Sequence, residues 1–169
     1  MINLAKTSEL EKKARDLISN RGVTIDHIAE LVYYLQSAYH SDLDLDLCRE
    51  NVEKVLAKRE VQNAIITGIQ LDILAEKKQL EEPLQEIIEK DEGLYGIDEV
   101  IALSIVNVYG SIGFTNYGYI DKQKPGILKR LNDKSTGEVH TFLDDIIGAI
   151  AAAASSRLAH TYAEEMEND

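Results

Sequence analysis

The amino-acid sequence predicts an all-α protein, a single domain over residues 1–169 in which about seven or eight helices pack around one or two apolar central helices. Three observations predict this fold class. A chain of 169 residues is the size of one domain. The sequence has no Trp, two Phe and two Pro, so its core must be aliphatic and helix breakers are scarce. Apolar residues also recur at three- and four-residue spacing along most of the chain, which is the period of an amphipathic helix.

Capping signals and apolar periodicity divide the first half of the chain into four helical segments. The predicted segments run from Ser8 to Asn20, from Thr24 to Leu35, from Asp46 to Lys78, and from Pro83 onward. A Ser8-x-x-Glu11 capping box opens the first segment, and Thr24 caps the second. The third is too long for one straight helix, so we expect a break at Gly68 or near Arg59.

The second half begins with a helix from about Ile97 to Tyr109 that is apolar on most sides and is therefore expected to be central. A glycine-dense loop over residues 110–119 follows, although Phe114–Ile120 also fits a strand. Pro125 then opens a short helix. Thr141 and an acid three residues later form a capping box for a last helix, which reaches about residue 165. Its small-residue stretch, 148–156, predicts a core or subunit-contact helix.

Charge and apolar runs limit the classes of function. The net charge of −12 argues against nucleic-acid binding, which depends on Lys and Arg. The same charge repels anionic lipid and phosphorylated substrates, so any phosphate chemistry needs a divalent cation or a local basic cluster. The apolar runs Val100–Phe114 and Ile146–Ser156 are shorter than the roughly 20 residues of a membrane span. Charged residues near the start and a single cysteine, Cys48, favour a soluble cytoplasmic protein without disulfides.

Two acidic stretches admit both a metal-binding and a plain structural interpretation. Asp42, Asp44 and Asp46 match the spacing of an EF-hand calcium loop, but Leu47 occupies the position that requires glycine. We therefore expect these acids to favour a helix N-terminus. The acidic run over residues 81–92 is similar to the glutamate-rich helices of magnesium-dependent nucleotide pyrophosphohydrolases, and a solvated helix face explains it equally well.

The strongest candidate site lies in the C-terminal half. A pair of adjacent acids opens each apolar helix, and a fifth acid with two lysines lies between the pairs: Asp98, Glu99, Asp121, Lys122, Lys124, Asp144 and Asp145. Buried carboxylates are costly unless they are paired or bind a metal. Hard oxygen ligands for an ion, next to ammonium groups for a phosphate, predict a magnesium–phosphate site. We expect the loop residues Gly110, Gly113 and Asn116 to line the same cleft and to contact the phosphate.

Three short blocks in this half carry a resemblance to a known family. The blocks are Gly96-Ile97-Asp98-Glu99, Ile120-Asp121-x-x-Lys124-Pro125 and Leu143-Asp144-Asp145-Ile146-Ile147-Gly148. Their order and separations resemble the C-terminal signature blocks of phosphatidylglycerophosphatase A, over about residues 95–155. The whole chain is similar to the soluble, all-helical branch found in Gram-positive bacteria. It departs from the membrane-embedded members by lacking transmembrane helices and their N-terminal Gly-Thr-x-Gly loop, and Ile97 stands where they have Trp.

The resemblance implies a magnesium-dependent phosphatase that removes the terminal phosphate of phosphatidylglycerophosphate. Asp98, Glu99, Asp144 and Asp145 would then hold Mg²⁺. Lys124, with Lys122, would neutralise the phosphate, and Asp121 would orient Lys124 or activate water. Either water or an Asp, with Asp145 among the catalytic acids, would act as nucleophile. The binding partner would be a phospholipid headgroup, which the protein would reach by transient contact at the inner face of the membrane. Assembly of the protein into homo-oligomers is compatible with such an activity. The alternatives are the nucleotide pyrophosphohydrolase and a non-catalytic helical interaction protein.

Overall fold

The computed structural model describes residues 4–168, so residues 1–3 and 169 of the predicted domain lie outside the described part. These residues form nine α-helices and two short 3-10 helices, and none of them is in a strand. The elements are α1 (Leu4–Asn20), α2 (Ile25–Gln36), α3 (Leu45–Leu56), α4 (Arg59–Glu76), α5 (Leu84–Glu89), α6 (Ile97–Val106), η1 (Asn107–Tyr109), α7 (Ser111–Gln123), α8 (Ile127–Leu131), η2 (Lys134–Thr136) and α9 (Leu143–Glu167). The predicted all-α single-domain bundle is confirmed.

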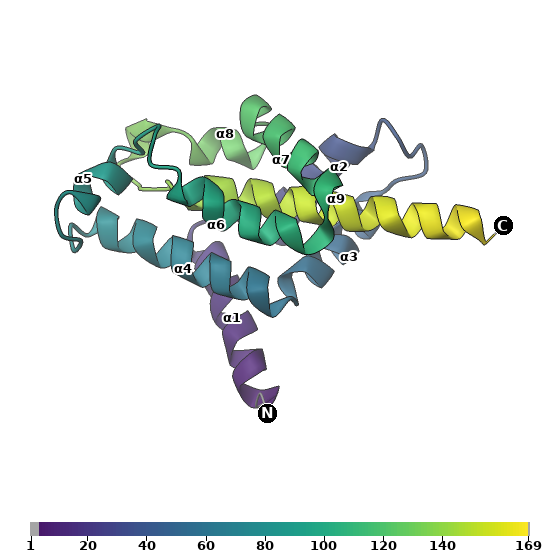
Figure 1. The fold of residues 1–169 in the computed structure, drawn as a ribbon, viewed down its shortest axis with the longest axis horizontal. Helices are drawn as coiled ribbons and strands as arrows, with labels where there is room; N and C mark the ends of the chain where they lie inside the picture. The colour runs from purple at the N-terminus through teal and green to yellow at the C-terminus, as the bar shows by residue number, and fades with distance from the viewer. Residues whose placement is uncertain (1–3, 169) are drawn as a thin grey trace.

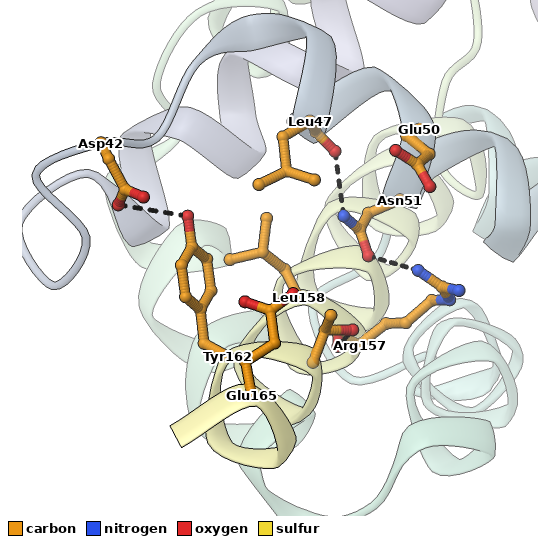
Figure 2. Close-up of a pocket in the computed structure, with 9 residues that line it drawn as sticks. Asp42, Leu47, Glu50, Asn51, Arg157, Leu158, Tyr162 and Glu165 are labelled. Atoms are coloured by element: carbon orange, nitrogen blue, oxygen red, sulfur yellow. Dashed lines mark hydrogen bonds between the residues drawn. The ribbon is translucent and has the colours of Figure 1, made fainter. Parts of the chain in front are cut away.

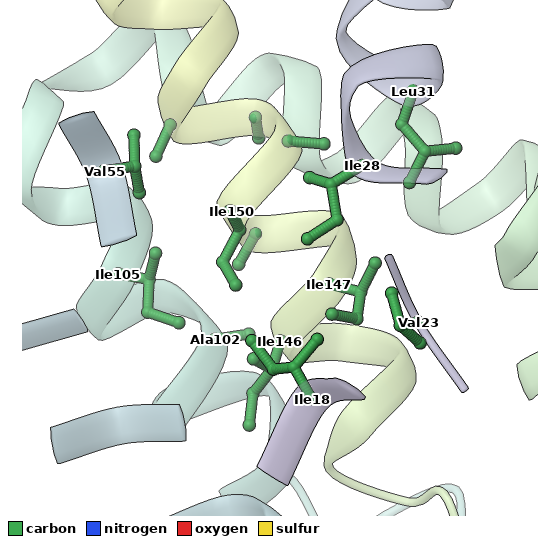
Figure 3. Packing of buried hydrophobic residues seen from close by; sticks show 14 of the residues in the cluster. Ile18, Val23, Ile28, Leu31, Val55, Ala102, Ile105, Ile146, Ile147 and Ile150 are labelled. Carbon is green, nitrogen blue, oxygen red and sulfur yellow. The ribbon is translucent and has the colours of Figure 1, made fainter. Parts of the chain in front are cut away.

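Helix α9 is the central element of the bundle. In Figure 1 it crosses the molecule horizontally in yellow, and its last turns project beyond the other helices toward the C-terminus. It contacts α2, α3, α4, α6, α7 and α8, and all its residues from 143 to 156 are buried. Residues 146 to 156 are aliphatic or small and carry no charge, which allows this part of the helix to be buried on every side. Figure 3 shows the surrounding core residues, which come from four other helices: Ile18, Ile28, Val55, Ala102 and Ile105.

Helices α4 and α9 cross at an unusually short separation. A Cβ atom at Gly68 would lie 2.4 Å from Cδ1 of Ile146 and 3.0 Å from Cβ of Phe142. Glycine therefore leaves room here for the side chains of Ile146 and Phe142, and it does not interrupt α4. The predicted break in the long helical run instead falls at Arg59, where α4 begins. Thr24 caps α2 as predicted, but Ser8 lies inside α1, so the predicted capping box at that residue is wrong.

The N-terminus of α9 is capped from a distant part of the chain. The predicted cap, Thr141, instead donates its hydroxyl to the carbonyl of Ile88 at 2.6 Å. The carboxylate of Asp72, on α4, accepts the amides of Phe142 and Leu143, each at 2.9 Å. The predicted capping box is therefore wrong. The acid that replaces it is separated from the helix by 70 residues of sequence and is fully buried.

The predicted glycine-dense loop is also wrong, because Ser111–Gln123 forms helix α7. Gly113, Tyr117 and Ile120 lie at helical spacing and are buried. Each glycine in a helix costs about 1 kcal/mol relative to alanine, and burial of this face against α9 outweighs that cost. The strand alternative for residues 114–120 fails for the same reason. Among the helices of residues 4–168, none is both long enough and apolar enough to cross a bilayer.

Candidate active site

The first turns of α6 and α9 meet at one end of the bundle. Asp98 and Glu99 lie in the first turn of α6, and Asp144 and Asp145 lie in the first turn of α9. Because α6 and α9 pack against each other, the two pairs converge, as the sequence predicted. They line one cavity of about 180 Å³ together with Asp91, Glu92, Gly93, Asp121, Lys124 and Asn132. Asp121 and Lys124 come from the C-terminal end of α7, which returns to the cavity after packing along α9.

Lys124 bridges two of these carboxylates. Its Nζ lies 2.6 Å from Oδ1 of Asp121 and 3.2 Å from Oδ2 of Asp144. Burial acts to lower the pKa of Lys124, but Asp144 and Asp121 outweigh this effect and raise it. The side chain therefore remains a positively charged ammonium group throughout the physiological range. It is the single basic side chain among the described residues that line the cavity.

The two carboxylates on α9 are buried, and this burial disfavours their ionised forms. Asp144 and Asp145 are each 6% exposed. Burial raises the pKa of Asp144, and Lys124 opposes the rise. The pKa of Asp145 is raised by burial, by the charge of Asp144, and by a hydrogen bond shared with Asp98. Two carboxyl groups share such a bond only when one of them carries a proton. Without a cation, the cluster therefore retains protons that exposed carboxylates would release.

The backbone amides at the start of α9 are already hydrogen-bonded. Asp72 accepts the first two, as described above. The amide of Asp144 donates to the carbonyl of His140 at 3.2 Å, and the amide of Asp145 donates to Oδ1 of Asp144 at 2.8 Å. A phosphate at this helix end would find no free N–H group, although helix N-termini often bind phosphate in that way. The anion would instead depend on Lys124 and on a cation.

The donor set fits Mg²⁺ in its chemistry. Four carboxylates from two helices supply hard oxygen atoms, and Mg²⁺ in proteins uses one or two carboxylates and keeps several waters. Over residues 4–168, no group of three or more His, Cys, Asp or Glu side chains is already arranged to ligate an ion directly. An ion bound here would therefore need to be held by few carboxylates and to keep several of its waters.

Backbone conformation also distinguishes this cavity. Lys124 and Asp91 both have left-handed backbone angles, with φ of 47° and 51°. Non-glycine residues adopt this region infrequently, because the side chain crowds the backbone. One further described residue, Lys78, does so. Such conformations are concentrated at functional sites, where surrounding structure holds them in place.

Part of the predicted acidic run belongs to this same site. Asp91 and Glu92 line the cavity, and Asp91 accepts a hydrogen bond from Lys134 at 2.6 Å. The other acids of the run are exposed, and two of them form ion pairs, Glu86 with Lys90 and Glu89 with Lys78. The acidic composition of residues 81–92 was thus a usable signal for Asp91 and Glu92. Asn132 also lines the cavity, and nothing in the sequence singled it out.

Four predicted phosphate-binding residues do not line the cavity: Gly110, Gly113, Asn116 and Lys122. Gly110 immediately precedes α7, and the helix rises about 15 Å from its first residue, Ser111, to Asp121. Gly113 instead permits close packing, because a Cβ there would lie 2.8 Å from Cγ1 of Val106. The expectation that residues 110–119 line the carboxylate cleft is corrected: none of them does, and α7 reaches the cavity only at Asp121.

The EF-hand-like acids take ordinary structural roles. Asp44 caps α3 by accepting the amide of Leu47 at 2.8 Å, and Asp46 pairs with Arg49. Asp42 accepts the hydroxyl of Tyr162 at 3.4 Å, at the edge of a cavity of about 240 Å³ between α3 and α9 (Figure 2). In that cavity the side-chain oxygen of Asn51 accepts a hydrogen bond from the guanidinium of Arg157 at 2.7 Å, and its amide nitrogen donates to the carbonyl of Leu47 at 2.9 Å. These polar groups of the cavity therefore already have partners within the protein. None of the predicted site residues lies there.

The fold and the cavity together define an all-helical protein with an acidic, lysine-bridged site at the N-termini of two packed helices. A family model described as Phosphatidylglycerophosphatase A matches residues 17–160. This match covers most of the chain, so the chain belongs to the phosphatidylglycerophosphatase A family. The matched region includes all four carboxylates of the two helix pairs, together with Asp121 and Lys124.

Similar proteins share the whole fold. The chain is 72% identical over 153 residues to the uncharacterized protein YutG of Bacillus subtilis, which covers 90% of this chain and 92% of that protein. It is 56% identical over 166 residues to YpjQ of the same organism, covering 96% and 93%. A crystal structure of the low temperature requirement C protein from Listeria monocytogenes superposes with a TM-score of 0.90 at 70% identity, covering 91% of this chain and 97% of that one.

Proposed function

We propose that the protein is a magnesium-dependent phosphomonoester hydrolase that removes the terminal phosphate of phosphatidylglycerophosphate to give phosphatidylglycerol. The observation that carries this proposal is the cavity at the start of α6 and α9, where four carboxylates from two helices face one bridging ammonium group. Family membership supplies the substrate, because the matching family model is described by that activity.

In this proposal Asp98, Glu99, Asp144 and Asp145 hold Mg²⁺, directly or through water. The ion supplies charge neutralisation, polarisation of the phosphoryl group and a more acidic bound water. Lys124 donates from Nζ to a phosphate oxygen and neutralises part of its charge. Its ion pairs with Asp121 and Asp144 fix the ammonium group at the cavity before substrate arrives, so little reorganisation is needed on binding.

Asp121 is the residue that moves the proton. The oxygen of an attacking water bonds to phosphorus, and the bond from phosphorus to the glycerol oxygen breaks. A carboxylate oxygen of Asp121 accepts the proton that the water releases and returns it to the glycerol oxygen, so that free phosphate and a hydroxyl group result. An alternative role for Asp121 is only to orient Lys124. An alternative nucleophile is an Asp carboxylate, which would form an aspartyl-phosphate that acid quenching can trap.

The surface beside the cavity supports transient contact with the inner face of the cell membrane. The sequence from residue 100 to residue 120 contains no charged residue, although charged residues make up 28% of the chain. Leu94 is 94% exposed and Val100 is 59% exposed, and both flank the residues that line the cavity. These exposed apolar side chains offer a lipid contact that does not itself add to the repulsion between an anionic lipid surface and a protein of net charge −12.

The test is phosphate release from phosphatidylglycerophosphate in mixed micelles, with and without Mg²⁺. Asp145→Asn should lower magnesium-dependent turnover on the order of 100-fold, since it removes an ion ligand. The matched control is Asp46→Asn, an exposed acid on α3 that pairs with Arg49 outside the cavity, and it should retain full turnover. Full activity in Asp145→Asn, or equal activity without metal in the parent, contradicts the proposal. Nucleoside triphosphates in the same panel test the pyrophosphohydrolase alternative.

A further inference from the structure

The phenol of Tyr117 is buried without a hydrogen-bond partner next to the candidate active site. The side chain is 7% exposed, and its hydroxyl contacts no polar partner among residues 4–168. Tyr117, Asp121 and Lys124 are spaced four and three residues apart at the C-terminal end of α7, so they share one face of the helix. Tyr117 is therefore the next residue, one turn earlier, on the face that carries two cavity residues.

The ring of Tyr117 packs against α9 immediately beyond the carboxylate pair. Its Cε2 lies 3.8 Å from the position that a Cβ of Gly148 would occupy. Gly148 is three and four residues after Asp145 and Asp144, so it lies one helical turn further along the same side of α9. The aromatic ring therefore packs on α9 about one helical turn from the two carboxylates.

The surroundings of the hydroxyl are acidic. Burial raises the pKa of Tyr117, and the charges of Asp145, Asp121 and Asp144 raise it further. The phenol thus remains protonated and able to donate. A phenol that is buried without an acceptor destabilises a protein, and such groups normally find partners. The acceptors nearby are the carboxylates of the cavity. Among them Asp145 acts most strongly on the phenol.

We infer that Tyr117 is a positioning residue of the proposed metal site: its hydroxyl, which has no partner among the described residues, would donate a hydrogen bond to Asp145 when an ion is bound and fix the carboxylate in the orientation that holds the ion. The inference rests on the proposed function, because it requires Asp145 to be an ion ligand. Tyr117 itself does not line the cavity, so it acts through Asp145 without touching the substrate. Hydrogen bonds from such supporting groups orient metal ligands and raise metal affinity.

The variant Tyr117→Phe tests this role, because it removes the hydroxyl and keeps the ring that packs on Gly148. The measurement is Mn²⁺ binding by electron paramagnetic resonance, with Mg²⁺ as competitor, on the full-length protein. We expect metal affinity to fall at least about tenfold. The melting temperature of the metal-free protein should stay the same or rise, because the variant removes an unpartnered buried hydroxyl. A tyrosine with a purely structural role would leave metal affinity unchanged.

Tyr109→Phe is the matched control. The hydroxyl of Tyr109, in η1, is also buried without a partner, and its charged neighbours are Arg157 and Glu60, outside the cavity. It lies before the first turn of α7, about 20 Å along the helix from the cavity end. This variant should bind Mn²⁺ as the parent does.

The outcomes separate the inference from the proposed function. If the parent binds neither Mn²⁺ nor Mg²⁺, the proposed metal site is wrong, and the role of Tyr117 is wrong with it. If the parent binds metal and Tyr117→Phe binds it equally well, the metal site stands and the inference is overturned. An equal loss of affinity in Tyr117→Phe and Tyr109→Phe also overturns it, because the effect would not depend on proximity to Asp145.

Discussion

Replacing Asp72 by alanine should destabilise the protein more than removal of an ordinary helix cap. The carboxylate of Asp72 accepts the amides of Phe142 and Leu143, and all three residues are fully buried. In Asp72→Ala both amides lose their acceptor at a position that water does not reach. The start of α9, which carries Asp144 and Asp145, therefore loses its anchor to α4.

The expected loss follows from the two amides. A buried donor without a partner costs about 1–3 kcal/mol, so two cost about 2–6 kcal/mol. Part of this is offset, because burial raises the pKa of Asp72 well above its ordinary value, which shows that burying its charge is itself unfavourable. We expect the free energy of unfolding to fall by about 2–4 kcal/mol in Asp72→Ala. Asp72→Asn keeps one acceptor oxygen and should lose less.

Urea denaturation at pH 7 in the absence of metal measures both variants against a matched control. Asp44→Ala removes the exposed cap of α3, in which the carboxylate accepts the amide of Leu47, and should cost about 1 kcal/mol. The reasoning is refuted if Asp72→Ala loses no more stability than Asp44→Ala. Loss of metal affinity in Asp72→Ala would further show that this carboxylate positions the acids of α9.

Three further predictions concern the cavity and its rim. Burial raises the pKa of Asp144 from 3.8 to about 6, so between these values the folded, metal-free protein holds a proton that the unfolded chain has released. The free energy of unfolding of the metal-free protein should therefore fall as the pH rises from about 4 to 6, by up to about 1.4 kcal/mol per pH unit. Excess Mg²⁺ should flatten this dependence of stability on pH. A stability that does not change with pH in the absence of metal contradicts the prediction. Lys124→Ala should lower turnover about 100-fold because the phosphate loses its ammonium partner. Mn²⁺ should still bind, because an ammonium group cannot ligate the ion. Loss of Mn²⁺ binding would refute the assignment of Lys124 to the phosphate. Leu94→Glu should weaken co-sedimentation with phosphatidylglycerol vesicles and leave hydrolysis of a water-soluble phosphomonoester unchanged; unchanged sedimentation would exclude Leu94 from the lipid contact.

The carboxylate pairs were predictable because their positions follow from local rules. Two largely apolar segments should pack together, and acids in their first turns then meet if both helices begin at the same end of the bundle. Asp98 and Asp145 satisfy both conditions. The acidic residues of the site could thus be predicted because they lie at the starts of helices, and sequence patterns indicate helix starts well. Of these two helices only α9 is central, however: α6 keeps one face at the surface, with Ile97 48% and Val100 59% exposed, so the expectation that it is also central is wrong.

Other features depend on contacts that no local pattern encodes. Asp72 lies within a continuous helical run, and only the tertiary crossing at Gly68 brings it to the start of α9. The α7 segment was misinterpreted as a loop because its glycines have low helix propensity. Burial of Gly113 and Tyr117 against neighbouring elements decides its structure. Asp91 reaches the cavity through a left-handed turn after α5, which composition could not show.

The charge inventory of the cavity explains why a cation is central to the proposed mechanism. Seven acids and one lysine line it, and a phosphate monoester would add further negative charge. The amides of α9 are taken by Asp72, by His140 and by Asp144 itself, so this helix cannot offer them to the anion. Lys124 alone cannot balance the surrounding carboxylates, and its bonds to Asp121 and Asp144 already occupy part of its charge. Mg²⁺ would replace the protons retained by the α9 acids and reverse the local charge that repels phosphate. In this arrangement the acids that repel a phosphate when no ion is bound are the groups that would hold the ion, and through it the phosphate.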